Sequence, residues 1–367
     1  MLNRRQFLQA SLATLVAGSL SSRLAVAGPE QGPLILSAVD DEAGHHRIAG
    51  VDLKGQTHFQ LPVGDRCHGG CARPGTLQAI LFARRPGRHF YVVDTRRGEI
   101  AHTIAAGDGY HFYGHGTFSH DSRYLYVTVN QYDTGEGIVR VYDAERNYAA
   151  VRDMPVGGIG PHELLLHPDG NTLVVALGGI KTHPDYDRIK LNPDTMEPAL
   201  LLMDRHSGDV RQRFKPSHHQ LSCRHLGISP EGIVIAGYQY QGPTWESRPL
   251  IARYDSNTDT YSEIALPKSL QRSLHNYVAS VAVSPVSPLS LVTAPRGDRV
   301  VVINHQTSER VGDHEVPDVA GALALPDGGF VVSSGNGSLH RIAADGQSAR
   351  SFADLDIHWD NHLTFYG

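Results

Sequence analysis

The sequence has no cluster of basic residues and no long apolar run. Its 367 residues include 33 lysines and arginines and 38 acidic residues, which give a formal net charge of −5. Because surfaces that bind nucleic acid gather basic residues, this balance argues against a nucleic-acid partner. The apolar run Ala10–Leu20 is too short to span a membrane. The chain is 40% hydrophobic without a low-complexity tract, so we expect a folded protein with a substantial core.

Cysteine is scarce, since the chain has only Cys67, Cys71 and Cys223. An oxidising compartment would allow one disulfide and leave one thiol over. A bridge from Cys67 to Cys71 or to Cys223 is the simpler expectation. The alternative is thiolate ligation of a soft metal, because Cys67 adjoins His68 and Cys223 lies two residues before His225.

Common catalytic fingerprints and helical periodicity are also missing. No serine–histidine–aspartate order, phosphate-binding glycine loop or dinucleotide motif stands out. Short runs rich in valine, isoleucine, tyrosine and threonine alternate with turns roughly every eight to twelve residues, which predicts an all-β fold. Examples of the expected strands are Leu34–Val39, Ile48–Leu53, His89–Val93, Tyr124–Val129, Ile138–Tyr142, Thr172–Ala176, Leu200–Met203, Ile233–Gly237, Leu250–Tyr254, Leu289–Thr293, Val300–Asn304 and Gly329–Ser333.

A repeated segment organises the chain. At Gly158–Gly170 a histidine precedes a short apolar run and a turn, and variants recur at Gly114–Ser122 and Ser222–Gly232. The repeats have these anchor positions: His68, His115, His162, His225, Ser280, Gly321 and His362. Repeats of roughly forty to fifty residues with four strands each predict a seven-bladed β-propeller. The last repeat has only one strand, Asn361–Phe365, and residues 34–61 can supply the others, so the N- and C-terminal strands are expected to close one blade.

The first 27 residues resemble an export signal. Asn3–Gln9 contains the paired arginines of a twin-arginine motif, and Ala25–Ala27 fits a small-residue cleavage site. We therefore expect residues 1–27 to be a twin-arginine signal peptide that directs the protein to the bacterial periplasm. Residues 28–367 are expected to form the propeller, as a monomer.

An insertion lengthens the repeat that follows His162. Residues 178–198 are polar, rich in proline and poor in strand pattern. Loops of this length are usually functional or disordered. We expect this one to lie between the second and third strands of a blade, either as a cover over one face or as a surface loop.

Short motifs follow one another along the mature chain. They are Phe82–Gly87, Phe112–Ser119, Gly158–Glu163, Gly178–Pro184, Lys190–Asn192, Met196–Pro198, Arg224–Leu226, Gln239–Gly242, Asn276–Val278, Pro295–Gly297 and Trp359–His362. With them the chain resembles the bacterial family catalogued as domain of unknown function 1513. The resemblance implies a periplasmic propeller encoded near imelysin-type and dihaem-peroxidase-like proteins, and hence iron acquisition with periplasmic iron-uptake proteins as partners. A shorter segment, Tyr126–Asn130, resembles lactonase-type propellers.

Five of the seven anchors are histidine. Because the inner strands of a propeller line its channel, we expect His68, His115, His162, His225 and His362 to converge at one mouth of that channel. Converging neutral imidazoles can bind iron, copper or zinc, and iron or copper is the expected cofactor. The alternative is that each histidine only ties neighbouring blades together by hydrogen bonds.

Residues beside the anchors complete the expected site. Glu163 and Asp360 could each bind the metal or hold an imidazole in place. Arg66 and Arg224 disfavour a bare cation and suit an anionic ligand, such as a carboxylate chelate of the metal. Further candidates at the same mouth are Tyr113, which lines it or plugs the gap between blades, and Gln239.

These features support three hypotheses about function. The first is a periplasmic protein that binds a metal or a metal chelate. The second is an enzyme, a metal-dependent hydrolase of lactones or esters or a redox enzyme, which would need an open metal position beside a catalytic carboxylate. The third is an interaction scaffold in the cell envelope, which would expose an apolar patch.

Overall fold

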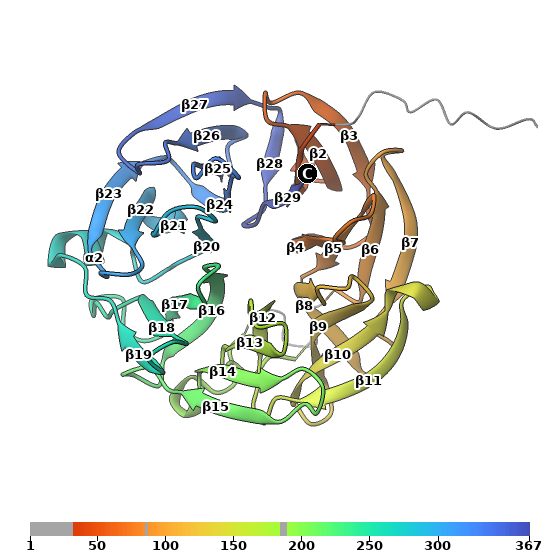
Figure 1. The fold of residues 1–367 in the computed structure, drawn as a ribbon, viewed down its shortest axis with the longest axis horizontal. Helices are drawn as coiled ribbons and strands as arrows, with labels where there is room; N and C mark the ends of the chain where they lie inside the picture. Colours follow the sequence, from red (N-terminus) through yellow and green to blue (C-terminus); the bar gives the residue numbers. More distant parts are fainter. Residues whose placement is uncertain (1–31, 85–86, 184–188) are drawn as a thin grey trace, which may run out of the picture. The chain divides into compact units, whose positions relative to one another are not determined.

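Seven antiparallel sheets surround a central channel in the computed structural model, which describes residues 32–84, 87–183 and 189–367. Six sheets have four strands and one has five (Figure 1). This arrangement confirms the predicted seven-bladed β-propeller. The expected signal peptide, residues 1–27, lies outside the described residues.

Each blade runs from an inner strand beside the channel to an outer strand. The first three complete blades are β4 (Cys67–Ala72), β5 (Gln78–Ala83), β6 (His89–Asp94) and β7 (Glu99–Ala105); β8 (Tyr110–Phe118), β9 (Tyr124–Gln131), β10 (Gly137–Asp143) and β11 (Ala149–Pro155); and β12 (Pro161–Leu166), β13 (Thr172–Leu177), β14 (Ala199–Asp204) and β15 (Val210–Phe214). The next three are β16 (Leu221–Ile228), β17 (Ile233–Tyr240), β18 (Ile251–Asp255) and β19 (Thr260–Glu263); β20 (Ser280–Val283), β21 (Leu289–Ala294), β22 (Arg299–Asn304) and β23 (Arg310–Glu315); and β24 (Val319–Ala324), β25 (Phe330–Ser334), β26 (Ser338–Ile342) and β27 (Ala349–Asp354).

The seventh blade joins the two ends of the propeller. The C-terminal strands β28 (Ile357–Trp359) and β29 (Thr364–Tyr366) both pair with β1 (Leu34–Asp41), which continues to β2 (His46–Asp52) and β3 (Thr57–Pro62). The predicted closure of one blade by N- and C-terminal strands is therefore confirmed. The closure pairs the inner edge of β1 and fixes the segment that carries His362 between β28 and β29.

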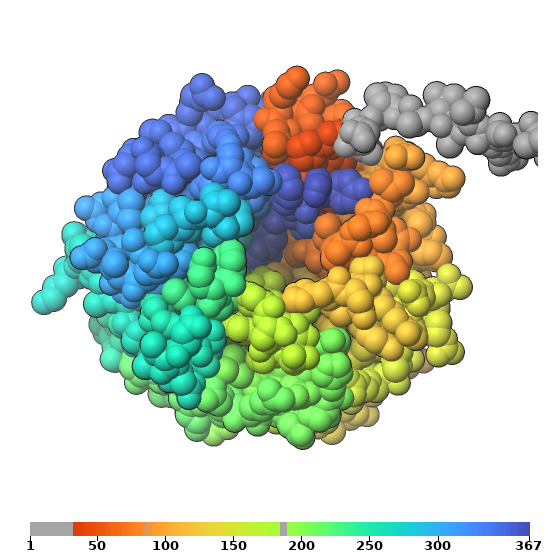
Figure 2. Space-filling model, in the orientation of Figure 1, coloured from red at the N-terminus to blue at the C-terminus, as the bar shows by residue number. Residues whose placement is uncertain are grey.

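Apolar residues pack between adjacent blades around the ring. The second strand of a blade is buried on both faces, as in β13, whereas an outer strand such as β7 alternates between exposed and half-buried residues. One apolar cluster joins the β4–β7 and β8–β11 blades through Phe82, Phe90 and Phe112. Burial at every blade interface holds the inner strands in place, and the space-filling view shows the hollow that they surround (Figure 2).

Few segments depart from the strand pattern. The insertion at residues 178–198 does lie between β13 and β14, the second and third strands of its blade, and residues 184–188 within it are outside the described part. A short helix α2 (Lys268–Ser273), which the sequence did not suggest, connects β19 to β20. Among the described residues, no helix has the length and apolar character needed to cross a membrane.

The structure has no disulfide between the cysteines, and Cys67, Cys71 and Cys223 are all free thiols, so the expected bridge is not formed. Cys67 belongs to an apolar cluster with Tyr91, whereas Cys71 packs against the cluster of Phe82 and Cys223 lies in a third cluster. The three side chains therefore point into separate parts of the core. Burial raises the pKa of the Cys223 thiol to about 12, which also argues against its ligation of a metal as a thiolate.

Candidate metal centre

Four of the five anchor histidines lie on inner strands at irregularities of the strand ladder. The sequence pattern placed them just before the inner strands, but the structure places them within β4, β8, β12 and β16. At each one the register with the second strand shifts, and a β-bulge of this kind re-aims the side chains beside it. The shifts fall between Cys67 and Gly70, between Phe112 and Gly116, between Pro161 and Glu163, and between Cys223 and His225.

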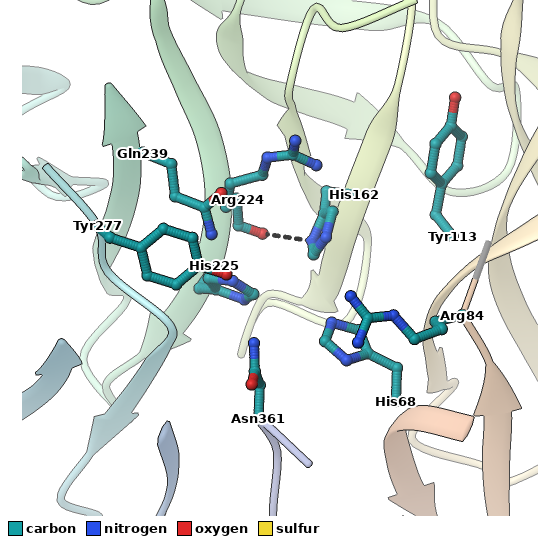
Figure 3. Close-up of a pocket in the computed structure, with 9 residues that line it drawn as sticks. All are labelled: His68, Arg84, Tyr113, His162, Arg224, His225, Gln239, Tyr277 and Asn361. Atoms are coloured by element: carbon teal, nitrogen blue, oxygen red, sulfur yellow. Dashed lines mark hydrogen bonds between the residues drawn. The ribbon is translucent and has the colours of Figure 1, made fainter. Parts of the chain in front are cut away.

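The five imidazoles form one cluster in the channel. Ring centroids of neighbouring histidines lie between 4.4 and 5.9 Å apart. Their nitrogen atoms form two groups in which all ligand atoms lie within 4.8 Å of one another. One group is His68, His115 and His362, and the other is His115, His162 and His225. Figure 3 shows His68, His162 and His225 converging from three different blades.

A glycine next to His115 makes this approach possible. Gly114 has a φ of +102°, and a Cβ atom on it would lie 3.0 Å from the Cβ and Cδ2 atoms of His68. A larger residue would therefore be strained by its backbone and would press on the neighbouring imidazole. The motif Gly-His-Gly in the sequence thus has a local physical reason.

Polar partners hold Nδ1 of four of the histidines. His68 Nδ1 donates to Asp360 Oδ1 at 2.7 Å. His225 Nδ1 lies 3.2 Å from Glu163 Oε2, an oxygen that already accepts the backbone N–H of Leu226 and can accept from the imidazole as well. His162 Nδ1 donates to the backbone carbonyl of Arg224 at 3.1 Å. For His115, the nearest carboxyl oxygen to Nδ1 is Glu163 Oε1 at 3.8 Å, which is too far for a hydrogen bond.

The fourth held histidine is His362. Ser280 Oγ lies 2.9 Å from His362 Nδ1 and 2.8 Å from the carbonyl oxygen of Asn361. The hydroxyl can donate only to the carbonyl, so it accepts a hydrogen bond from Nδ1–H of His362. Ser280 is the anchor of its own blade, and it serves here to orient the histidine of another.

This pattern leaves Nε2 of each held ring as a lone-pair donor. Nδ1–H is fixed by acceptors, so the tautomer places the free lone pair on Nε2. Within the described part of the chain, Nε2 of His115 and Nε2 of His362 are both buried and have no hydrogen-bond partner. Leaving a buried polar atom unpaired costs about 1–3 kcal/mol, and His115 and His362 bring two such atoms into one cluster.

The electrostatics keep the imidazoles neutral. Burial lowers the pKa of all five, and for His115, His162, His225 and His362 it falls well below the ordinary value. The neighbouring imidazoles and Arg224 lower it further. Only the neutral ring can bind a metal, so no proton has to leave these rings at neutral pH before a cation binds.

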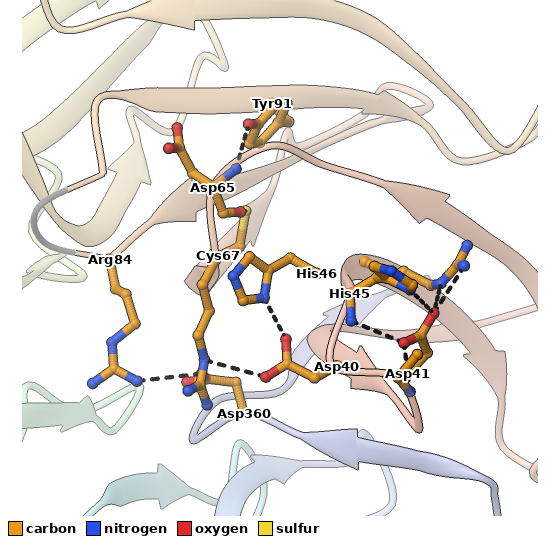
Figure 4. Close-up of polar contacts among 12 residues, drawn as sticks. Asp40, Asp41, His45, His46, Asp65, Cys67, Arg84, Tyr91 and Asp360 are labelled. Carbon is orange, nitrogen blue, oxygen red and sulfur yellow. Dashed lines mark hydrogen bonds and ion pairs between the residues drawn. The ribbon is translucent and has the colours of Figure 1, made fainter.

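Two carboxyl groups stand behind the histidines. Burial would raise the pKa of Asp360, but His68 and the guanidinium groups of Arg84 and Arg66 hold it well below its usual range. Asp360 Oδ2 lies 2.8 Å from Arg66 and 3.5 Å from Arg84, whose contact appears in Figure 4. Burial raises the pKa of Glu163 to about 8.

A cavity of about 80 Å³ adjoins the cluster. His68, His162, His225, Arg84 and Arg224 all line it, and Figure 3 shows the two arginine side chains among the histidines. The remaining lining residues are Tyr113, Gln239, Tyr277 and Asn361. The site therefore has a side on which imidazole nitrogens meet open space.

The structure brings most of the predicted residues together. Glu163 and Asp360 hold imidazoles, Tyr113 and Gln239 line the cavity, and Arg66 lies behind Asp360 and outside the cavity lining. Four residues of the site were not predicted as part of it: Arg84, Tyr277, Ser280 and Asn361. Their only signal was their place in the family-like motifs or, for Ser280, at an anchor.

Comparisons with known proteins support the fold and the family. No curated protein matches the chain. Among solved structures, the chain is similar to Kuenenia stuttgartiensis hydrazine synthase, with a TM-score of 0.62 and 16% sequence identity over 85% of this chain and 90% of that one. At this identity the similarity shows the propeller fold alone. A family model described as "Protein of unknown function (DUF1513)" matches residues 61–366, and the chain therefore belongs to that family.

Proposed function

We propose that this protein binds a divalent transition-metal ion through Nε2 of the anchor histidines. The observation that carries the proposal is the asymmetry of the rings. Partners hold Nδ1 of four of them, while Nε2 of His115 and His362 is buried without a partner. Each of the four Nδ1 contacts joins two blades, so tying blades together accounts for Nδ1 but leaves Nε2 of these rings without a role. Orientation of Nδ1 by a carboxylate or carbonyl is typical of histidines that bind metals.

One ion per chain is the expected load. Both histidine groups contain His115. With Nε2 of His115 as the ligand atom, only one of the two groups can hold an ion at a time. Sites built from imidazole suit copper, iron, nickel and zinc, and copper binds most tightly among the divalent ions. Copper or iron is therefore the metal that we propose, in the periplasm if residues 1–27 act as the export signal.

Binding is favoured over hydrolysis by the cavity lining. A hydrolase would place a general base near the open side of the metal. Among the described residues, those that line the cavity include no aspartate or glutamate, because Glu163 and Asp360 hold the imidazoles from behind. A place in iron acquisition rests on the family resemblance, and no contact in the site bears on it.

Elemental analysis of the protein purified from the bacterium, from the periplasm if it is exported, tests the proposal. We expect near-stoichiometric copper or iron in the unaltered protein and almost none in His115→Gln, because His115 belongs to both groups. The matched control is His305→Gln. His305 is also buried, is also held at Nδ1 by a serine and also has an unpartnered Nε2, but it lies in neither group.

Two outcomes would contradict the proposal. One is the absence of metal from the unaltered protein together with an unchanged melting temperature on addition of copper or iron. The other is equal loss of metal in His115→Gln and His305→Gln, which would show that general destabilisation rather than ligand loss removes the ion.

A further inference from the structure

The two histidine groups differ in their access to the cavity. We call the group of His115, His162 and His225 the outer group, and the group of His68, His115 and His362 the inner group. Two members of the outer group, His162 and His225, line the cavity. Among the described residues that line it, the inner group has His68 alone. An ion in the cavity therefore faces two ligands of the outer group and one ligand of the inner group.

The inner group is the more compact of the two. Its ring centroids lie 4.4, 4.7 and 5.1 Å apart, compared with 5.0, 5.0 and 5.9 Å in the outer group. Two glycines allow this close packing of β4 and β8. A Cβ atom on Gly69 would lie 2.7 Å from His115 Nδ1, and a Cβ atom on Gly114 would lie 3.0 Å from His68 Cβ. The imidazoles of His68 and His115 therefore fill the space between these two strands.

The inner group also contains both of the clustered rings whose Nε2 is buried and unpaired, His115 and His362, within the described part of the chain. An ion that binds these two nitrogen atoms displaces no water from them and provides the partner that they lack. At His162 and His225 the ion competes with water in the cavity. Because His115 belongs to both groups, the difference between them depends on His362, and it favours the inner group.

We propose that the inner group is the resting position of the metal ion, and that His162 and His225 receive the ion from the cavity on its way there. This inference rests on the proposed metal binding and deepens it, since it names the position of the ion and its route of uptake. An ion that enters the protein must lose water, and burying it without ligands is costly. Two imidazoles at the cavity wall can replace part of that water while the ion is still beside the cavity. His115, which both groups share, can then hold the ion as it passes inward.

A matched pair of variants tests the resting position, because each variant removes one histidine from a single group. His362→Gln leaves the inner group with two histidines, and His162→Gln leaves the outer group with two. Copper(II) is the probe. Its coordination is followed by electron paramagnetic resonance, and its affinity is measured by competition with a chelator. We expect His362→Gln to change the spectrum and to weaken binding at least roughly tenfold, whereas His162→Gln keeps the spectrum and the affinity of the unaltered protein.

The rate of uptake should respond in the opposite way. In stopped-flow absorption we expect copper uptake to slow at least roughly tenfold in His162→Gln, because the ion loses a ligand at the cavity wall. Its release to a chelator should slow by the same factor, since the affinity is unchanged. His225→Gln is a second outer-group variant and should behave in the same way. His305→Gln is the control, because His305 is buried but lies in neither group, and it should leave spectrum, affinity and rates unchanged.

The outcomes separate this inference from the proposed function. If the unaltered protein takes up no copper, metal binding fails and this inference fails with it. If copper is bound but His162→Gln changes the spectrum and the affinity while His362→Gln does not, the ion rests in the outer group and this inference alone is overturned. It is also overturned if both variants change the spectrum alike, because the histidines then act as one site. Uptake in His162→Gln and His225→Gln as fast as in the unaltered protein would overturn the route.

Discussion

Two groups of blades use the same anchor position differently. In five blades the position carries a histidine, whereas the β20–β23 blade has Ser280 there and the β24–β27 blade has Gly321. Both exceptions lie next to the segment that carries His362. Ser280 accepts the hydrogen bond from His362 Nδ1, and the space beside Gly321 is filled by Leu363.

The difference shows that a repeated position can either supply a ligand or support the ligand of another blade. The break between β28 and β29 lets His362 reach into the cluster, and it needs room on that side of the channel. A side chain larger than serine or glycine at these two anchors would occupy that room. The histidine cluster is therefore asymmetric around the ring of blades, and the small residues Ser280 and Gly321 make room for it.

Ser280→Ala is expected to have the largest effect, and it tests whether the Ser280 anchor supports the histidine of another blade. Loss of the oxygen that fixes the His362 tautomer should weaken metal binding by about 10- to 100-fold, as is usual for the outer partner of a metal-binding histidine. Competition with a chelator of known affinity measures the change. The matched control is Ser290→Ala, which removes the same contact, at 2.9 Å, from His305 outside the cluster.

Equal metal affinities for Ser280→Ala and the unaltered protein would show that Ser280 is only a small residue at a crowded position. Only the small size of the side chain at this anchor would then matter, and its hydroxyl would have no role. A loss of affinity in Ser290→Ala as large as in Ser280→Ala would instead indicate an effect on folding.

Much of the fold could be predicted because each blade of the propeller is encoded by short, local sequence patterns. The strand ends fell within a few residues of the observed ones, as for Tyr124–Val129 within β9, since apolar alternation and turn residues are local signals. The closure of the last blade followed from one missing set of strands. The short helix α2 could not be foreseen, because six residues are too few to show a helical period.

The site was predictable in part for the same reason. The histidines repeat in the sequence, so their convergence followed from the fold. Arg84 and Tyr277 do not lie at repeated positions, and only the folded chain brings them to the cavity. The roles of Glu163 and Asp360 depended on which nitrogen they face, which spacing cannot show.

The histidine group should also make the stability of the metal-free protein depend on pH. Burial lowers the pKa of His362 well below the 6.5 of an unfolded chain. Below about pH 6.5 the unfolded state therefore binds protons that the folded state does not, and the free energy of unfolding decreases as the pH falls. Each such imidazole contributes a slope of up to about 1.4 kcal/mol per pH unit.

His362→Gln should reduce that slope between about pH 6.5 and 5, as measured by urea unfolding in the presence of a chelator. The control is His206→Gln, because His206 is exposed and lies far from the cluster in the turn after β14. Identical slopes for the unaltered protein and His362→Gln would contradict the account of a buried neutral imidazole at this position.

The smallest effect is expected at the other small anchor. A Cβ atom on Gly321 would lie 2.4 Å from Ser333 Oγ and 3.0 Å from Leu363 Cγ, so Gly321→Ala must displace both side chains. We expect a loss of about 1 kcal/mol in the free energy of unfolding, at the low end of the cost of overpacking, because both atoms belong to side chains that can shift. Gly64→Ala is the control, since a Cβ atom there meets nothing within 4 Å.

Displacement of Leu363 also moves its neighbour His362, so Gly321→Ala should weaken metal binding while Gly64→Ala does not. If Gly321→Ala were destabilised with its metal affinity intact, the glycine would serve packing alone, and Ser280 would be the only anchor that supports a histidine of another blade.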